Sequence, residues 1–125
     1  MRITFLALLT LLAALPARAD MNISLTADGG TESTAYAVLR YGRGSMLLDS
    51  ATPSGTPDFG SGTLTVYVKR RDGEWSPWVA YTSESEMPSN PLMFNFGRDD
   101  VELYVALSSS TDPDLYVEIV EAKNR

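Results

Sequence analysis

Hydrophobic and polar residues alternate over short segments through most of the chain, and this alternation predicts β-strands. The clearest case is residues 63–70, where Leu64, Val66 and Val68 should face a core while the residues between them face outward. No long window repeats apolar positions at helical spacing without a Gly or Pro interruption. The expected strands are residues 22–26, 34–41, 45–49, 63–70, 74–82, 92–96, 101–107 and 115–121.

Turn-forming residues separate these segments. Gly is tolerated where the backbone needs a positive φ, so residues 42–44 should form a tight connection and residues 72–73 a hairpin turn. Pro77 cannot donate a hydrogen bond to a neighbouring strand and should lie at a sheet edge or a bulge. Residues 51–62 and 83–91 are rich in Gly, Pro and Ser, and we expect loops there.

Together these patterns predict the fold class. We expect an all-β protein, an antiparallel β-sandwich of about eight short strands that is either jelly-roll-like or Ig-like. Residues 34–41 should place Ala35, Ala37, Leu39 and Tyr41 on one face of their strand. No linker and no second domain is expected within residues 20–125.

The first nineteen residues differ from the rest and read as an export signal. Arg2 supplies a positive start, residues 3–15 are almost wholly apolar, and Ala17-Arg18-Ala19 offers a cleavage site before Asp20. The domains are then residues 1–19, the signal peptide, and residues 20–125, a single domain that is exported to the periplasm or secreted. The alternative is that translation starts at Met21, which would place the protein in the host cytoplasm or in a virion.

Charge argues against nucleic acid as a partner. The formal net charge is -6, and removal of residues 1–19 takes away Arg2 and Arg18 and no acid, which gives -8. Such a surface repels phosphate backbones, and the only basic cluster is Lys69-Arg70-Arg71. We therefore expect no nucleic-acid partner, and no membrane contact once the signal is removed.

The usual catalytic residues are missing. The chain contains no His and no Cys, which excludes imidazole bases, thiol catalysis and zinc-thiolate sites, and it has no G-x-S-x-G motif. We expect no enzymatic activity and no cofactor. A carboxylate-based hydrolase is the weak alternative, for which nothing in the sequence places two acids across a cleft; the acids present include Glu74, Glu84, Glu86 and Glu102.

Two acidic segments offer oxygen ligands for Ca²⁺, residues 99–100 and residues 112–114. Their spacing matches no calcium loop, and Asp is common in turns because its side chain bonds its own backbone. We expect turns there and no metal site.

An aromatic cluster is the best candidate for a contact site. Trp75, Trp78 and Tyr81 follow one another at intervals of three residues, close to Pro77. A regular strand would place the two tryptophans on opposite faces, and the irregularity at Pro77 can change this. Exposed, they would stack on sugar rings or anchor a protein interface. The alternative is packing, with one Trp closing an end of the sandwich and the other covering a loop.

Two motifs in the middle of the chain stand out. Residues 60–68 read Gly-Ser-Gly-Thr-Leu-Thr-Val-Tyr-Val, and residues 72–75 read Asp-Gly-Glu-Trp. This strand and turn resemble the central hairpin of small β-sandwich structural proteins encoded by tailed bacteriophages and prophages. Similar segments follow the family pattern over most of residues 21–122, namely residues 26–30, 35–41, 94–98, 101–107, 108–114 and 115–117.

The resemblance implies a virion structural or accessory protein, such as a head-decoration or tail-associated subunit. Its partners would be other structural subunits, including further copies of itself, and no catalytic residue carries over. Members of the family generally start where Met21 stands, so residues 1–19 are a departure from it. The alternative function is an exported β-sandwich binding module, for example for a glycan, which the signal and the aromatic cluster favour.

Overall fold

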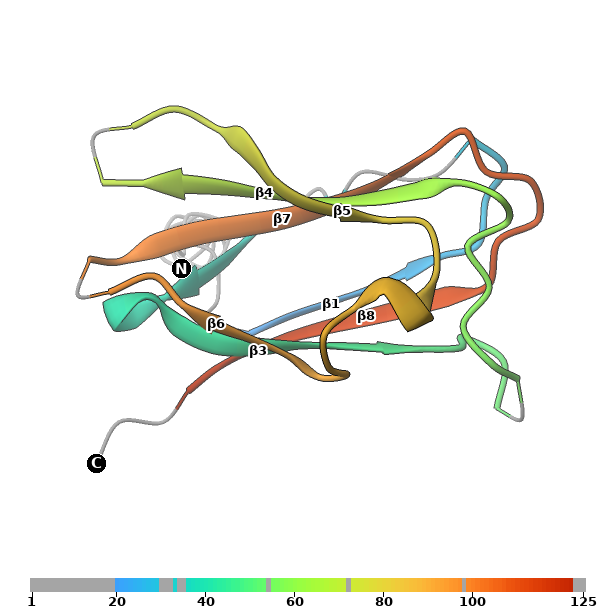
Figure 1. The fold of residues 1–125 in the computed structure, drawn as a ribbon, viewed down its shortest axis with the longest axis horizontal. Helices are drawn as coiled ribbons and strands as arrows, with labels where there is room; N and C mark the ends of the chain where they lie inside the picture. The colour runs from blue at the N-terminus through green and yellow to red at the C-terminus, as the bar shows by residue number, and fades with distance from the viewer. Residues whose placement is uncertain are drawn as a thin grey trace, which may run out of the picture.

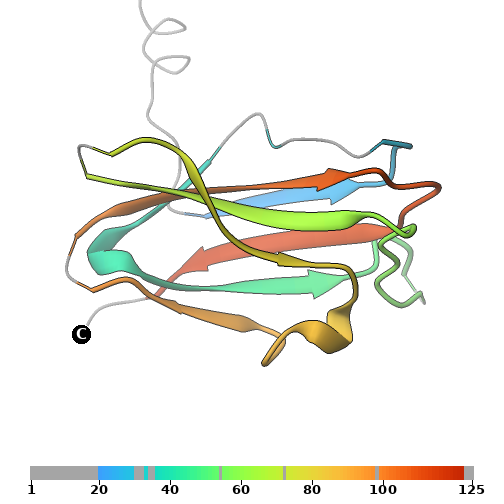
Figure 2. The same ribbon diagram turned by 45° about the horizontal axis from the view of Figure 1, so that its top comes forward.

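Eight antiparallel strands form two four-stranded sheets that lie face to face (Figures 1 and 2). The computed structural model describes residues 20–29, 33, 36–53, 55–71, 73–97 and 99–122. In this part of the chain the only helices are two short 3-10 turns, η1 (Arg40–Gly42) and η2 (Glu84–Glu86). The strands are β1 (Met21–Leu25), β2 (Ala37–Leu39), β3 (Arg43–Asp49), β4 (Thr63–Arg70), β5 (Ser76–Tyr81), β6 (Leu92–Asn95), β7 (Val101–Ser108) and β8 (Leu115–Glu121).

The strand pairing is nested. The order is β1-β8-β3-β6 in one sheet and β2-β7-β4-β5 in the other. The first strand therefore pairs with the last, β2 with β7, β3 with β6, and β4 with β5, always antiparallel. As a result β1 and β6 are the edges of one sheet, and β2 and β5 are the edges of the other.

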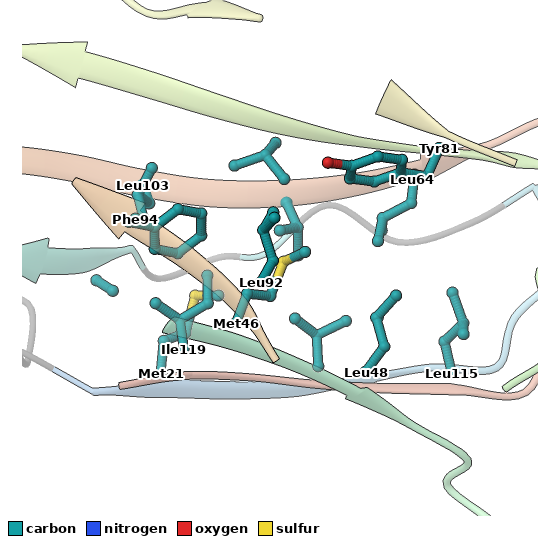
Figure 3. Packing of buried hydrophobic residues seen from close by; sticks show 14 of the residues in the cluster. Met21, Met46, Leu48, Leu64, Tyr81, Leu92, Phe94, Leu103, Leu115 and Ile119 are labelled. Atoms are coloured by element: carbon teal, nitrogen blue, oxygen red, sulfur yellow. The ribbon is translucent and has the colours of Figure 1, made fainter. Parts of the chain in front are cut away.

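The core lies between the sheets and is supplied by every second residue of the strands (Figure 3). On β7, Val101, Leu103 and Val105 are fully buried, with outward-facing residues between them. Burying one such side chain stabilises the fold by about 1.5–3 kcal/mol. The largest fully buried side chains come from both sheets: Leu25, Leu39, Met46, Leu64, Leu103, Leu115, Ile119, Val66, Val101, Val105 and Val117.

The structure confirms the all-β prediction and the existence of all eight predicted strands. The inward positions expected on β4 are buried, with Leu64 and Val66 fully so and Val68 at 6% exposure. Residues 51–62 and 83–91 connect strands, as expected, apart from the short turn η2 and one bridge between Asp58 and Asp114. Long alternating segments are the most reliable sequence signal, which explains the agreement.

One predicted strand is too long. The expectation for residues 34–41 put Tyr41 on the same face as Ala37 and Leu39, but β2 ends at Leu39 and Tyr41 is 53% exposed. Tyr41 has φ 59° and the next residue, Gly42, has φ 65°, so the chain turns sharply there. A Cβ at Gly42 would lie 2.9 Å from the Cβ of Phe96, which leaves room for glycine only.

The connection predicted at residues 42–44 is also displaced. The turn is η1, and β3 already begins at Arg43, which pairs with Asn95 on β6. Gly44 is a strand residue, where a Cβ would lie 2.5 Å from the carbonyl oxygen of Val120. Glycine is needed here because two backbones approach each other closely, and not because the chain turns.

Pro77 lies at both an edge and a bulge, as predicted. β5 is an edge strand, and its pairing with β4 shifts, because Val66 pairs with Val79 whereas Tyr67 pairs with Pro77. Trp78 is the extra residue between these two pairs. The bulge therefore changes the direction of Trp78 relative to its neighbours.

Several sequence predictions fall on residues outside the described part. These are the export signal at residues 1–19, the start of the strand at residues 34–35, and Asp72 in the hairpin turn. Within the described residues, no helix is long and apolar enough to cross a membrane. The first described residue, Asp20, accepts a hydrogen bond from the backbone N–H of Glu121 through Oδ1, at 3.2 Å.

Candidate functional site

The structure separates the three aromatic residues that the sequence singles out. Tyr81 is 8% exposed and belongs to the core, where Figure 3 shows it beside its strand partner Leu64. Trp75 and Trp78 are 36% and 38% exposed, but their ring contacts lie in different parts of the molecule. The two tryptophans therefore have different roles, and Tyr81 is not part of a contact surface.

Trp78 covers the open side of the sandwich between the edge strands β5 and β6. Its ring centroid lies 5.5 Å from that of Phe94 and 4.7 Å from that of Phe96, both with edge-on geometry. Phe94 is buried, and the guanidinium of Arg70 lies over the Phe96 ring at 5.5 Å from its centroid. Trp78 thus follows the packing alternative, because it shields the core where two strand edges meet.

Trp75 belongs to a group of rings on the outer side of the other sheet. Its ring centroid is 4.8 Å from that of Tyr104 and 5.9 Å from that of Tyr36, at interplanar angles of 71° and 69°. Tyr104 in turn stacks on its cross-strand partner Tyr67, with centroids 4.8 Å apart. We call these four residues, Tyr36, Tyr67, Trp75 and Tyr104, the aromatic row.

The sequence analysis missed three members of the aromatic row. Alternation on β4 and β7 points Tyr67 and Tyr104 outward, so that signal was present in the sequence. What it lacked was the register, which pairs Tyr67 directly with Tyr104 and brings two distant segments together. Tyr36 precedes β2, which pairs with β7, so it also depends on long-range pairing.

A polar hollow of about 680 Å³ adjoins the aromatic row. Its rim on the sheet consists of Val38, Glu102 and Lys69, which are cross-strand partners on β2, β7 and β4. Glu102 and Lys69 are two residues away from Tyr104 and Tyr67 on their respective strands. Because side chains two apart on a strand point to the same face, the aromatic row and the hollow lie on one face of the sheet. We call this feature the charged hollow; its lining is Val38, Lys69, Arg70, Arg71, Gly73, Asp99, Asp100 and Glu102.

The charged side chains of the hollow retain much of their hydrogen-bonding capacity. Asp100 Oδ1 accepts a hydrogen bond from the backbone N–H of Tyr41 at 3.1 Å, and Arg70 lies over Phe96. Between the described residues, the three cations and the three carboxylates of the lining form no salt bridge with one another. The hollow therefore presents cations from the end of β4 and carboxylates from the start of β7 and the turn before it, with hydrogen-bond donors and acceptors available.

The perturbed ionisable groups lie away from this face and stabilise loops. Hydrogen bonds from the side chains of Ser50 and Thr52, and from the backbone, hold the pKa of the Asp114 carboxyl below its usual range. Backbone and side-chain hydrogen bonds from Thr82 lower the pKa of Glu86 in the same way. Burial raises the pKa of the Tyr81 hydroxyl.

The acidic segments weighed as calcium ligands serve turns and loop contacts. Asp114 accepts hydrogen bonds from Ser50 Oγ and from the N–H of Ala51, and the N–H of Asp112 donates to Asp28 Oδ1. Among the described residues, no group of three or more acidic side chains is arranged to hold a metal ion. Of the glutamates considered for hydrolysis, Glu84 and Glu86 lie in η2, and Glu102 lies on β7.

The arrangement that stands out is therefore an outward aromatic row next to a charged hollow. Both features lie on the outer face of the sheet that contains β4 and β7. Comparison of the chain with protein-family models, with curated proteins and with solved structures gives no significant match.

Proposed function

We propose that this chain is a non-enzymatic structural or accessory subunit of a phage or prophage particle. It decorates the head or joins the tail, and it acts through protein–protein contacts with other structural subunits. The observation that carries this proposal is the aromatic row, a group of four large rings on one sheet face of a small acidic domain, of which Tyr36 and Trp75 are exposed and the other two are half-buried. The hairpin motif at residues 60–75 supports it as a resemblance.

The nested strand order supports the particle assignment further. Pairing of the first strand with the last, the second with the seventh, and so inward to β4 and β5 is typical of the jelly roll, so we infer that subtype over the Ig-like one. Jelly rolls recur in viral capsid proteins and in lectins. One fold can host many functions, so the jelly roll supports a virion protein only in addition to the aromatic row.

The composition of the aromatic row suits a protein interface. Tyr and Trp are enriched at interfaces, and truncation of a central anchor typically weakens binding by 2 kcal/mol or more, about thirtyfold. Trp75 and Tyr36 are each more than one-third exposed although they contact each other. A partner that covers them would bury large, rigid side chains at small entropic cost.

The test is to look for the chain in particles. Particles from an induced producing strain would be purified on a density gradient, and the chain detected by mass spectrometry and by immunogold labelling. We expect the wild-type chain to copurify with particles in a fixed ratio to the major capsid protein. A Tyr36→Ala/Trp75→Ala variant should be lost from them, whereas Met93→Ala, which alters an exposed side chain on β6 of the other sheet, should be retained. A chain that is found only in the periplasmic fraction contradicts the proposal.

The second candidate is an exported binding module. It is favoured by the signal-like pattern of residues 1–19 and by the charged hollow beside Trp75. Sequencing the N-terminus of the native protein separates the two, because an exported chain should begin at Asp20 and a cytoplasmic one at Met21.

A further inference from the structure

Among the described residues, the lining of the charged hollow carries three positive and three negative side chains. Lys69, Arg70 and Arg71 come from the end of β4, and Asp99, Asp100 and Glu102 come from the start of β7 and the turn before it. Neither a polyanion nor a polycation gains net attraction from such a lining, because each meets repulsion from half of it. The hollow therefore favours an occupant that is neutral yet rich in hydrogen-bonding groups.

Hydroxyl groups match this lining chemically. A hydroxyl donates one hydrogen bond and accepts two, so neighbouring hydroxyls can donate to carboxylates and accept from ammonium or guanidinium groups at the same time. Hydrogen bonds to charged partners are about twice as strong as those between neutral groups. The cations and carboxylates of the hollow form no salt bridges with one another within the described residues. Apart from Arg70, which lies over Phe96, and Asp100, which accepts a hydrogen bond from the N–H of Tyr41, these groups can therefore pair with a ligand.

The neighbouring ring supplies the second half of a sugar site. A sugar ring has a face of C–H groups that packs on an aromatic side chain, and Trp is the largest such surface. Trp75 is 36% exposed and contacts Tyr36 and Tyr104 edge-on. Tyr67 and Tyr104 stack on each other and thereby cover one face of each ring. Trp75 is consequently the member of the row best placed to receive a ligand next to the hollow.

The size of the hollow agrees with a small ligand. Binding sites for small molecules usually measure about 300–1,000 Å³, and the hollow has a volume of about 680 Å³. A phosphate backbone would meet three carboxylates there, which argues against nucleic acid.

We propose that the charged hollow and Trp75 together bind a neutral glycan. Lys69 and Glu102, adjacent across β4 and β7, would hold hydroxyl groups, while Trp75 packs on the C–H face of a sugar ring. Trp78 and Tyr81 take no part, since they face the sandwich edge and the core. This inference does not depend on whether the chain acts in a particle or as an exported module.

The experiment is a glycan array probed with the purified wild-type chain, followed by isothermal titration with the best neutral oligosaccharide found. The array includes neutral, sialylated and sulfated glycans, so that electrostatic capture is distinguishable. We expect binding to neutral glycans, weakened at least about tenfold by Trp75→Ala and to a similar degree by Glu102→Ala. Met93→Ala, on the opposite sheet, should bind like the wild type.

Thermal unfolding of each variant checks that it is folded. If Trp75→Ala does not fold, Glu102→Ala still tests whether the hollow binds the glycan. The proposal is overturned if no neutral glycan binds, if only charged glycans bind, or if both substitutions leave the affinity unchanged. Loss of particle binding by Tyr36→Ala/Trp75→Ala without any glycan binding would likewise overturn it and would leave the aromatic row as a protein interface.

Discussion

Trp75 and Trp78 are similarly exposed but have different structural roles. Trp78 packs on the buried ring of Phe94, whereas the ring contacts of Trp75 are with Tyr36 and Tyr104 on the outer sheet face. We expect Trp78→Ala to lower the free energy of unfolding by about 3 kcal/mol, near the lower limit for a large core truncation. Trp75→Ala should lower it by about 1 kcal/mol, the scale of one or two aromatic contacts.

Urea unfolding followed by circular dichroism measures both values on the same scale. Equal losses, or a larger loss for Trp75→Ala, would contradict the view that Trp78 contributes more to the core than Trp75 does.

Gly44 allows a second test, of the close approach between β3 and β8. A Cβ there would meet the backbone oxygen of Val120 at 2.5 Å, so β3 and β8 would have to separate. We expect Gly44→Ala to destabilise the protein by about 2–3 kcal/mol. Gly97 has φ 97° and open space around it, so Gly97→Ala should suffer only backbone strain, about 1–2 kcal/mol. Thermal unfolding of the two variants compares them, and a smaller loss for Gly44→Ala contradicts the close approach.

At the scale of elements, the loop from Ala51 to Gly62 is tied to the start of β8 by Asp114. The carboxylate accepts hydrogen bonds from Ser50 Oγ and the N–H of Ala51, and the backbone of Asp114 forms a bridge with Asp58. These bonds lower the pKa of Asp114 in the folded state, so its contribution to stability is present above the unfolded carboxyl pKa, about 4. It is lost as the pH falls through the lower folded value.

We therefore expect Asp114→Asn to be less stable than the wild type at neutral pH and to approach the stability of the wild type in acid. The measurement is the midpoint of urea unfolding between pH 7 and pH 3. A difference between the two proteins that stays constant over this range would contradict the role of the ionised carboxylate.

The elements themselves could be predicted from the sequence, because alternation over residues such as Leu64, Val66 and Val68 is local information. Tyr41 was misplaced because its positive φ follows from the turn into β3 and from the close approach of Phe96 to Gly42, which are tertiary contacts. The aromatic row was missed for the same reason. Tyr67 and Tyr104 become neighbours only through the register of β4 with β7.

At the scale of the whole molecule, the first strand is tied to the last strand of the chain. β1 starts at Met21, its inward residues Met21 and Leu25 are buried, and the strand pairs with β8 over its full length. We expect a chain that starts at Asp20 to unfold at the same urea concentration as one that starts at Met21. Removal of residues 1–25 deletes an edge strand and should abolish the cooperative transition. A cooperative transition in that truncated chain would show that β1 is dispensable.

The central claim is that the molecule works through the face that carries Trp75. Site-specific photo-crosslinking tests it most directly, with a photoreactive amino acid placed at position 75 in one sample and at position 93 in another, both in assembled particles. The account predicts a crosslink from position 75 to a structural protein of the particle and none from position 93. Crosslinks from position 93 alone, or equal crosslinks from both positions, would contradict it.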